Sequence, residues 1–293
     1  MQHSPWDEHH IDHLLALDRL GPGRWRTRHG DANLNGRSYG GQLLGQAMMA
    51  ALLEVPDGRT PTMMQFLFMQ GAIPEQTLDL QVTPLQDGKR FSSRHVRAAQ
   101  EGGRTVLDAQ VTCAVPIDSP SHAEPGTSPE GERPEELPGL DDIDPLLLGP
   151  LARLGGYSTD RKPSIEFRIP DPHQQLSRAT MNGRFRFWIR AAQPLPAGPG
   201  IHAAAFAYLS DWWANFCILG LHLRHMGERR LYISSLNHAI WFHQSFRADQ
   251  WLHLDSMSPY SGSGRGLAIC AVHDGQGRHV ASVTQECLMG YAD

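Results

Sequence analysis

The sequence is poor in cysteine. It has 4 cysteines among 293 residues, widely spaced and with no Cys-x-x-Cys pair: Cys113, Cys217, Cys270 and Cys287. Most of them have apolar neighbours in the sequence, and a cysteine in such surroundings usually behaves as a small buried hydrophobe. We therefore expect free thiols in a reducing compartment.

Further absences concern membranes and cellular address. No apolar run is long enough to span a membrane. The first residues, Met1 to His13, are polar and rich in histidine, and they lack the apolar core of a signal peptide. The last residues, Tyr291 to Asp293, differ from the peroxisomal Ser-Lys-Leu signal. These features predict a cytoplasmic protein without a membrane span.

Basic charge is not concentrated anywhere in the chain. The net charge of −5 is spread along the sequence, whereas a nucleic-acid-binding domain normally carries a basic stripe. We therefore expect no nucleic-acid partner. With 40% hydrophobic and 19% charged residues, the composition is that of a globular protein, and the length allows one large domain or two of moderate size.

The first half of the chain predicts a buried helix followed by strands. Ile11 to Leu20 has the apolar spacing of a short amphipathic helix, and Trp25 to His29 has the composition of an edge strand. Leu43 to Val55 is apolar on nearly every side, which is typical of a buried helix. Gln86 to Lys89 predicts a hairpin turn. Four strand-like runs follow the helix: Met63 to Phe68, Thr77 to Thr83, Phe91 to Ala99, and Val106 to Val115.

The second half repeats this order after a change of composition. From Asp118 to about Leu140 the chain is dominated by Pro, Ser, Gly and Glu, which indicates a linker or mobile loop. Ser210 to His225 then predicts a second apolar helix, and Asp274 to Gly277 a turn. The strand-like runs of this half are Ile165 to Ile169, Phe185 to Ala191, Tyr232 to Phe242, Trp251 to Met257, Gly266 to His273, and Val280 to Leu288.

This order predicts an α+β fold, a tandem (double) hotdog in which each half is an antiparallel sheet wrapped around a long buried helix. A parallel sheet would need a helix between successive strands, and the chain does not supply them. We expect an N-terminal hotdog at residues 1–117, a linker at 118–160 and a C-terminal hotdog at 161–293.

Three polar residues of the second half are candidates for chemistry. Asp211 stands at the predicted start of a helix, where the helix dipole favours a carboxylate. Ser235 and Gln285 lie in predicted strands, and a buried amide needs hydrogen-bond partners. Taken singly, each has a structural reading: Asp211 as a helix cap, Ser235 as a sheet hydroxyl, and Gln285 as a buried bonded amide.

Taken together, four segments resemble the acyl-CoA thioesterase II family. They are Tyr208 to Asp211, Ser235 to His243, Gly264 to Gly266, and Gln285 to Cys287. They match the family pattern of Tyr-x-Ser-Asp, Thr/Ser-Leu-Asp-His-x-Met/Ile-Trp-Phe-His, Ala-Arg-Gly and Gln-Glu-Gly in the same order. The resemblance implies hydrolysis of an acyl thioester by a water that Asp211, Ser235 and Gln285 hold. It implies no cofactor and no metal.

The first half carries matching segments. Tyr39 to Ala47 is similar to the family's Phe-Gly-Gly-Gln-x-x-Gly-Gln-Ala, and Leu85 to Arg94 to its Leu-Arg-Asp-Gly-x-x-Phe-x-x-Arg. Glycines at 40, 41 and 45 let another backbone or a thin acyl chain approach the helix. Backbone N–H groups at a helix start can bind an oxyanion, and Gly41 or Gln42 is our candidate donor. Close packing alone is the alternative reading.

Three more residues are assigned to substrate binding by the resemblance: Gln65, His238 and Arg265. The chain departs from the family in the segment that begins at Gln65 and at the residue before His238. The family has His-Tyr-Phe-Leu-Arg-Pro-Gly where this chain has Gln65 to Gly71, and Asp where this chain has Asn237. Since the first segment lies near the substrate tunnel by analogy, these departures predict an unusual acyl preference or altered CoA contacts. The resemblance also suggests a homo-oligomer.

Two other catalytic patterns are weaker. Gly36 to Gly40 matches Gly-x-Ser-x-Gly, but a nucleophile elbow must follow a buried strand, and the preceding segment is polar. His238 and His243 are five residues apart, which places them on opposite faces of a strand. His222 and His225 could share a helix face, yet no carboxylate stands at ligand spacing. We therefore predict no metal site from these histidines.

Two functional alternatives stay open at this stage. A hotdog hydratase or dehydratase would need a histidine that abstracts a proton next to the thioester, and the candidates are His202, His222, His238 and His243. A non-catalytic protein that binds acyl-CoA or an acyl carrier would keep the fold and the ligand affinity but not the hydrolysis. Our main prediction is a thioesterase acting on acyl-CoA or a carrier-bound acyl thioester.

Overall fold

The structure is a computed structural model that describes residues 1–123, 125–126, 131–155, 161–177, 179–223, 225–227 and 229–292. Residues 124, 127–130 and 156–160 of the predicted linker, and residue 224 of the predicted second helix, lie outside the described residues. No described helix is both long and apolar enough to cross a membrane.

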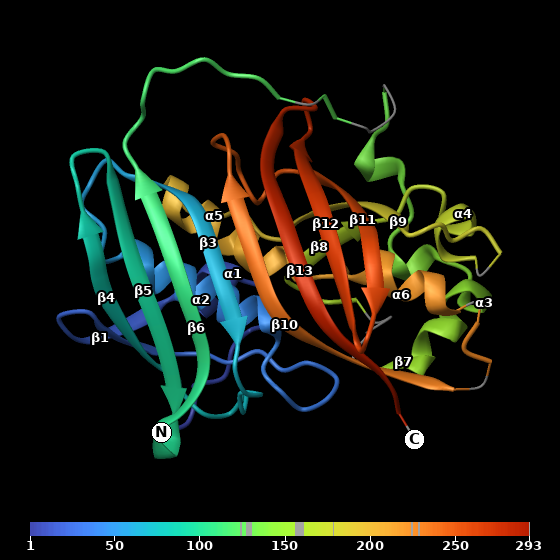
Figure 1. The fold of residues 1–293 in the computed structure, drawn as a ribbon, viewed down its shortest axis with the longest axis horizontal. Coiled ribbons are helices and arrows are strands. Elements are labelled where there is room, and N and C mark those ends of the chain that lie inside the picture. Colours follow the sequence, from blue (N-terminus) through green and yellow to red (C-terminus); the bar gives the residue numbers. More distant parts are fainter. Residues whose placement is uncertain are drawn as a thin grey trace.

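The described strands form one large, almost entirely antiparallel sheet (Figure 1). In order of lateral pairing they are β1 Leu17–Gly21, β2 Arg24–Thr27, β4 Asp79–Asp87, β5 Phe91–Gln100, β6 Arg104–Ala114, β3 Thr60–Phe68, β10 Arg230–Phe242, β13 His279–Ala292, β12 Arg265–Asp274, β11 Leu252–Gly262, β9 Arg184–Ala191 and β8 Ile165–Arg168. The short strand β7, Leu154–Gly155, pairs with β10 in parallel.

The two halves of the sheet join through β3 and β10. These strands pair antiparallel from Asn237 opposite Leu67 to Trp241 opposite Met63. On one side of this seam the order is β3, β6, β5, β4, and on the other it is β10, β13, β12, β11. The second half therefore repeats the first about the seam. The pairing also satisfies the backbone groups that two free sheet edges would leave open.

The main helices lie behind the sheet in the view of Figure 1. The α-helices are α1 Ile11–Leu15, α2 Gly40–Leu52, α3 Pro145–Leu148, α4 Pro172–Leu176, α5 Pro199–Leu209 and α6 Phe216–Leu223. Single turns of 3-10 helix occur at Glu101–Gly103, Pro134–Glu136 and Leu140–Asp142, and a slightly longer one at Gly149–Arg153. In the N-terminal half α2 packs against β4, β5 and β6, and in the C-terminal half α6 packs against β9, β11 and β12.

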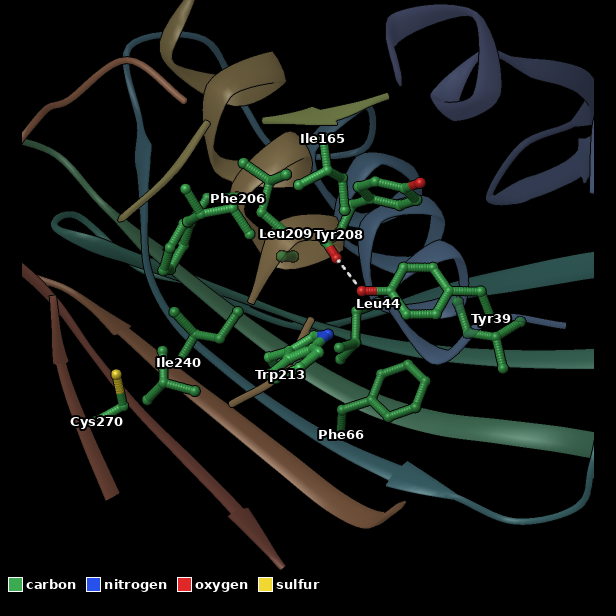
Figure 2. Packing of buried hydrophobic residues seen from close by; sticks show 14 of the residues in the cluster. Tyr39, Leu44, Phe66, Ile165, Phe206, Tyr208, Leu209, Trp213, Ile240 and Cys270 are labelled. Carbon is green, nitrogen blue, oxygen red and sulfur yellow. Dashed lines mark hydrogen bonds between the residues drawn. The ribbon is translucent and has the colours of Figure 1, made fainter. Parts of the chain in front are cut away.

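Helices α2 and α5 pack directly against each other at the centre of the molecule. A Cβ at Gly41 would lie 2.2 Å from the carbonyl oxygen of Tyr208, and one at Gly45 would lie 2.9 Å from that of Ala204. The glycines therefore allow the backbone of α5 to approach α2, one of the two readings of their spacing. The Tyr39 hydroxyl donates to the Tyr208 carbonyl at 3.1 Å and fixes the contact (Figure 2).

The sequence located most strands within a few residues but misplaced two helices. The predicted helix Ile11 to Leu20 ends at Leu15, and the following segment is strand β1 because it pairs with β2. Tertiary pairing outweighs local helix propensity there. The prediction of one helix over Ser210 to His225 is confirmed only at α6, Phe216–Leu223. The helix that packs on α2 is α5, which begins at Pro199, a residue suited to the first helical turn, and ends at Leu209, before the predicted start.

The described part of the predicted linker contacts the C-terminal half. Figure 1 shows a long connection running from the end of β6 across to that half. Trp188 Nε1 donates to Glu132 at 2.7 Å, and Trp251 Nε1 donates to Glu135 at 2.7 Å. These bonds attach the segment to β9 and to the start of β11. The boundaries at 117 and 160 stay a prediction.

Candidate active site

Asp211 lies in the loop between α5 and α6, two residues after the end of α5. The prediction that it begins a helix is wrong, and the C-terminal dipole of α5 would disfavour its negative charge. The favourable helix end comes from the other half of the molecule. A Cβ at Gly40, the first residue of α2, would lie 2.5 Å from Asp211 Oδ2, so the start of α2 directly abuts the carboxylate.

The three predicted catalytic residues meet through one amide. Gln285 Nε2 donates to Asp211 Oδ1 at 2.7 Å and to Ser235 Oγ at 2.7 Å. Gln285 is 1% exposed, so its amide is held inside the protein while it orients both oxygens. The structure therefore brings together side chains from β10, β13 and the α5–α6 loop that lie 50 and 74 positions from Gln285 in the sequence.

A β-bulge in β10 aims Ser235 at this site. Ser235 pairs with Cys287, but Asn237 pairs with Glu286, so Leu236 is the extra residue. The bulge places Ser235 and His238 on the same, helix-facing side of the sheet although they are three residues apart. Gln285, directly opposite His238, faces that side too. Without the bulge, strand alternation would place either Ser235 or His238 on the outer face of the sheet.

Burial sets the protonation of Asp211. Removal from water raises the pKa of its carboxyl to about 7, and hydrogen bonds from Gln285, the Gly41 backbone N–H and the Ser235 hydroxyl oppose that rise. Burial thus disfavours the ionised carboxylate of Asp211, while three hydrogen-bond donors stabilise it. A carboxyl group with this pKa can take up and release a proton near neutral pH.

The loop that carries Asp211 is strained. Trp213 has φ 57°, a left-handed conformation that is rare for a bulky side chain. Its ring packs against Phe167, Phe185 and Phe216 with centroid distances of 5.2 to 5.8 Å. Such a conformation costs on the order of 1–3 kcal/mol and persists where packing enforces it, often at functional sites. The aromatic cluster therefore determines the path of the backbone beside Asp211.

Asp211 and Ser235 line a cavity of about 910 Å³. Its apolar wall includes Tyr39, Leu43 and Phe68 from the N-terminal half. Its cationic residues are Arg37, Arg161 and Lys162. Both halves of the chain therefore contribute to the cavity, and its volume is within the range of small-molecule sites.

The oxyanion candidates differ in their placement. The Gly41 backbone N–H donates to the Asp211 carboxyl and so faces the candidate site. Gln42 is fully buried and engaged elsewhere: its N–H donates to Tyr39, its Oε1 accepts from the Asp31 N–H, and its Nε2 donates to Gln46. We therefore withdraw Gln42 as a donor and retain Gly41 as a prediction.

The structure places the three remaining predicted residues away from the cavity wall. Gln65 is exposed on β3, between the buried Met64 and Phe66, and thus faces the outer side of the sheet. Arg265 is exposed and pairs with Glu286 at 3.3 Å, on the side of β13 opposite Gln285. Strand alternation, which a motif alone does not reveal, separates them from the site.

His238 is buried behind the catalytic loop. Its Nε2 lies 3.0 Å from Ser210 Oγ, and burial lowers its pKa to about 3. The neutral ring therefore contacts the residue before Asp211 and does not line the cavity.

Three residues of the segment in which the chain departs from the family pattern, Phe68, Met69 and Gln70, do line the cavity. Met69 stands where the family has Arg, so this wall is less charged.

One buried polar network was missed by the sequence analysis. Lys162 Nζ lies 2.7 Å from Asp31 Oδ1, and the Tyr208 hydroxyl donates to Asp31 Oδ2 at 3.0 Å. Ser164 Oγ lies 2.8 Å from the same hydroxyl. Asp31 is 6% exposed, and burial raises its pKa although Lys162 opposes the rise. Because Asp31 and Lys162 are 131 positions apart, no local pattern could have paired them.

The three candidate residues, Asp211, Ser235 and Gln285, offer no set of metal ligands. They supply one carboxylate, one amide and one hydroxyl. Among the described residues, the one group of three metal-ligating side chains with converging ligand atoms is Asp7, His10 and His13. No histidine is among the described residues that line the cavity. The arrangement suits the orientation of a water molecule by hydrogen bonds.

The chain matches two family models. Residues 28–114 match the acyl-CoA thioesterase N-terminal domain, and residues 134–289 match the acyl-CoA thioesterase C-terminal domain. Human acyl-coenzyme A thioesterase 8 is 31% identical over 265 residues, which cover 87% of this chain and 80% of that protein. Acyl-CoA thioesterase 2 of Haemophilus influenzae is 23% identical over 286 residues, covering 96% and 97%.

Solved structures show the same architecture. The acyl-CoA thioesterase II TesB2 of Mycobacterium marinum has a TM-score of 0.76 and 25% identity, covering 97% of this chain and 99% of that one. A protein with a hot dog fold from Alicyclobacillus acidocaldarius has a TM-score of 0.74 and 17% identity, with coverage of 97% and 99%. These likenesses confirm the predicted tandem hotdog fold.

Proposed function

The chain belongs to the acyl-CoA thioesterase family, and from that premise we propose that Asp211, Gln285 and Ser235 hold and activate the water that hydrolyses its substrate. The enzyme is a thioester hydrolase acting on acyl-CoA. The observation that carries the proposal is the double hydrogen bond of Gln285 to Asp211 and Ser235 beside the cavity. The amide fixes the two oxygens that would receive the water.

In the proposed reaction the water oxygen attacks the thioester carbonyl carbon while the Asp211 carboxylate accepts a water proton. The carbonyl oxygen becomes an oxyanion. Protonation of Asp211 weakens its hydrogen bond from the Gly41 N–H, and that N–H at the start of α2 would then stabilise the oxyanion. The carbon–sulfur bond then breaks, and the CoA thiolate takes the proton back from Asp211. The products are the free acid and CoA. A pKa of about 7 for Asp211 suits both proton transfers.

We assign the CoA moiety to the cationic side of the cavity. Arg37 and Arg161 line it, and neither forms an ion pair with any of the described residues. CoA carries a diphosphate and a 3′-phosphate, and guanidinium groups bind phosphate oxygens strongly. Lys162 is committed to Asp31. The two arginines are therefore the groups we propose for the phosphates.

Location and assembly stay proposals. Cytoplasmic location is supported by the four cysteines, which are all free and buried, as expected in a reducing compartment. Homo-oligomerisation is supported by the family resemblance of the sequence. A carrier-bound acyl thioester stays a prediction beside acyl-CoA as a second substrate.

The deciding experiment measures release of free thiol from a panel of acyl-CoAs, short to long and branched to aromatic. Wild type and Gln285→Ala are compared side by side. Hydrolysis that depends on Gln285 supports the proposed mechanism. A folded Gln285→Ala protein with wild-type kcat on every substrate would overturn it. The hydratase or dehydratase alternative lacks support because none of its candidate bases, His202, His222, His238 and His243, is among the described residues that line the cavity.

A further inference from the structure

A cluster of one carboxylate and two imidazoles lies at the start of α1, outside the three candidate residues of the active site. His10 Nδ1 is 2.7 Å from Asp7 Oδ2, and His13 Nδ1 is 3.4 Å from the same oxygen. The three ligand atoms all lie within 4.8 Å of one another. The Nδ1 atoms of His10 and His13 therefore both lie near the same carboxylate oxygen of Asp7. We propose that Asp7, His10 and His13 form a binding site for a divalent transition-metal ion, with Zn²⁺ as the preferred occupant.

The spacing of the ligand atoms fits such an ion. Zinc takes nitrogen and oxygen ligands at roughly 2.0–2.2 Å in tetrahedral geometry, which places neighbouring ligand atoms roughly 3.3 Å apart. The observed 2.7 and 3.4 Å separations bracket that value, so small side-chain rotations complete the site. Two imidazoles and one carboxylate form a ligand set used by open zinc sites, in which water fills the fourth position. Imidazole ligands disfavour Mg²⁺ and Ca²⁺.

The turn before α1 uses only one carboxylate oxygen of Asp7 and leaves the other available to a metal ion. Asp7 Oδ1 accepts the backbone N–H groups of His9 and His10, each at 3.0 Å. These bonds hold the carboxylate in place, while Oδ2 faces the two rings. The His10 and His13 rings stack with centroids 4.9 Å apart. The ligands are thus oriented before any ion binds, which lowers the entropy lost on binding.

Neighbouring groups supply further support. His13 presents its other nitrogen, Nε2, to the Asp12 carboxylate at 4.0 Å, and metal-binding histidines commonly pair their second nitrogen with a carboxylate. Trp6 Nε1 donates to the His10 carbonyl at 2.9 Å, and the Trp6 ring packs edge-on to Tyr208. Side chains of the cluster are 42 to 57% exposed, so an ion can enter from solvent.

The site has a structural consequence for the cavity. Glu8, between the ligand Asp7 and His9, has φ 62° and lines the catalytic cavity. A bound ion would link the turn at Asp7 to α1 and so fix the position of Glu8. The inference does not depend on the proposed hydrolytic mechanism, because its residues and its readout are separate from Asp211.

The test is a calorimetric titration of the full chain with ZnCl₂ in a non-chelating buffer. Wild type is compared with the double variant His10→Ala/His13→Ala and with His9→Ala, a matched removal of an exposed neighbouring histidine. We expect one Zn²⁺ per chain with a Kd on the order of micromolar. The double variant should bind at least about tenfold more weakly, and His9→Ala should bind as wild type does. Circular dichroism confirms that each variant is folded.

A second group of histidines is the alternative location for a Zn²⁺ ion detected by the titration. His243 and His279 both lie close to Ser282 Oγ, at 2.9 and 3.1 Å. The variant His243→Ala/His279→Ala should bind Zn²⁺ with wild-type affinity. Loss of binding in that variant, unchanged binding in His10→Ala/His13→Ala, or no uptake by wild type would each overturn the proposal.

Discussion

The first residue of α2, Gly40, faces the carboxylate of Asp211 so closely that a Cβ there would lie 2.5 Å from Oδ2. A methyl group at this position must therefore displace Asp211. We expect Gly40→Ala to lower kcat at least about tenfold, because a misplacement of about 1 Å can cost a hundredfold. Gly41→Ala instead meets the Tyr208 backbone at 2.2 Å and should reduce the free energy of unfolding by about 1–3 kcal/mol.

The measurements for this pair are steady-state kinetics and urea denaturation. Gly21→Ala is the matched control, since no atom lies within 4 Å of a Cβ there. Wild-type kcat in a folded Gly40→Ala protein would contradict the contact between α2 and Asp211.

Substitution of Asp211 should abolish the pH dependence of hydrolysis together with most of the rate. With a pKa of about 7, the carboxylate becomes available as a base as the pH rises, so wild-type kcat should increase between pH 6 and 8. Asp211→Asn keeps the shape but cannot accept the proton, and kcat should fall by at least about a hundredfold. A kcat–pH profile of both proteins, measured at saturating acyl-CoA, checks this. A wild-type profile that is flat through pH 7 would exclude Asp211 as the base.

The same carboxyl should make the fold less stable as the pH rises. In the unfolded chain Asp ionises above about pH 3.9, whereas in the folded protein burial delays ionisation to a pKa of about 7. Between these values the unfolded state binds fewer protons, so the stability contributed by this group falls with increasing pH. Asp211→Asn removes the effect. Urea denaturation at pH 5 and pH 8 should show a larger loss for wild type than for the variant.

Removal of Lys162 should be more damaging than removal of the whole ion pair. Lys162→Met leaves Asp31, 6% exposed, as a buried carboxylate without its cation, and the free energy of unfolding should drop by about 3–5 kcal/mol. The double variant Asp31→Asn/Lys162→Met removes both charges and should recover part of the loss. Denaturant unfolding of the two single variants and the double variant gives the coupling between them. Additive losses would show that the pair contributes no coupling energy.

Arg37 and Arg161 should matter for CoA but not for the acyl group. Arg37→Ala and Arg161→Ala are each expected to raise KM for an acyl-CoA several-fold, with kcat preserved, because their proposed contacts are with the phosphates, away from the thioester. The matched substrate is the corresponding acyl-pantetheine, which lacks the phosphates. Its KM should be the same in wild type and variants. An equal rise for both substrates would assign the arginines to folding or to the acyl site.

Local pattern predicted most strands, and short motifs picked out Asp211, Ser235 and Gln285, which the structure brings together, since alternation and short motifs are properties of neighbouring positions. It could not predict the geometry that depends on distant contacts. Helix α5 was missed although Ala203 to Leu209 is buried on every side, as α2 nearly is; the apolar stretch continues into α6, and the prediction covered only that second part. Asp211 consequently moved from a predicted helix start to a helix end, and its supporting dipole comes from α2. The structure places Gln65 and Arg265 on the outer face of the sheet, which motif matching could not predict because it does not specify which face of a strand a side chain occupies.

The pairing of β3 with β10 has a consequence for how the enzyme is assembled. Two identical half-molecules brought together along this seam would carry the same residues at matched positions, and dilution could separate them. In this chain the halves are covalently joined and differ in sequence. The N-terminal half contributes the helix start with Gly40 and Gly41, and the C-terminal half contributes Asp211. The two halves thus contribute different residues to the candidate site, and because they belong to one chain, assembly of that site does not depend on protein concentration.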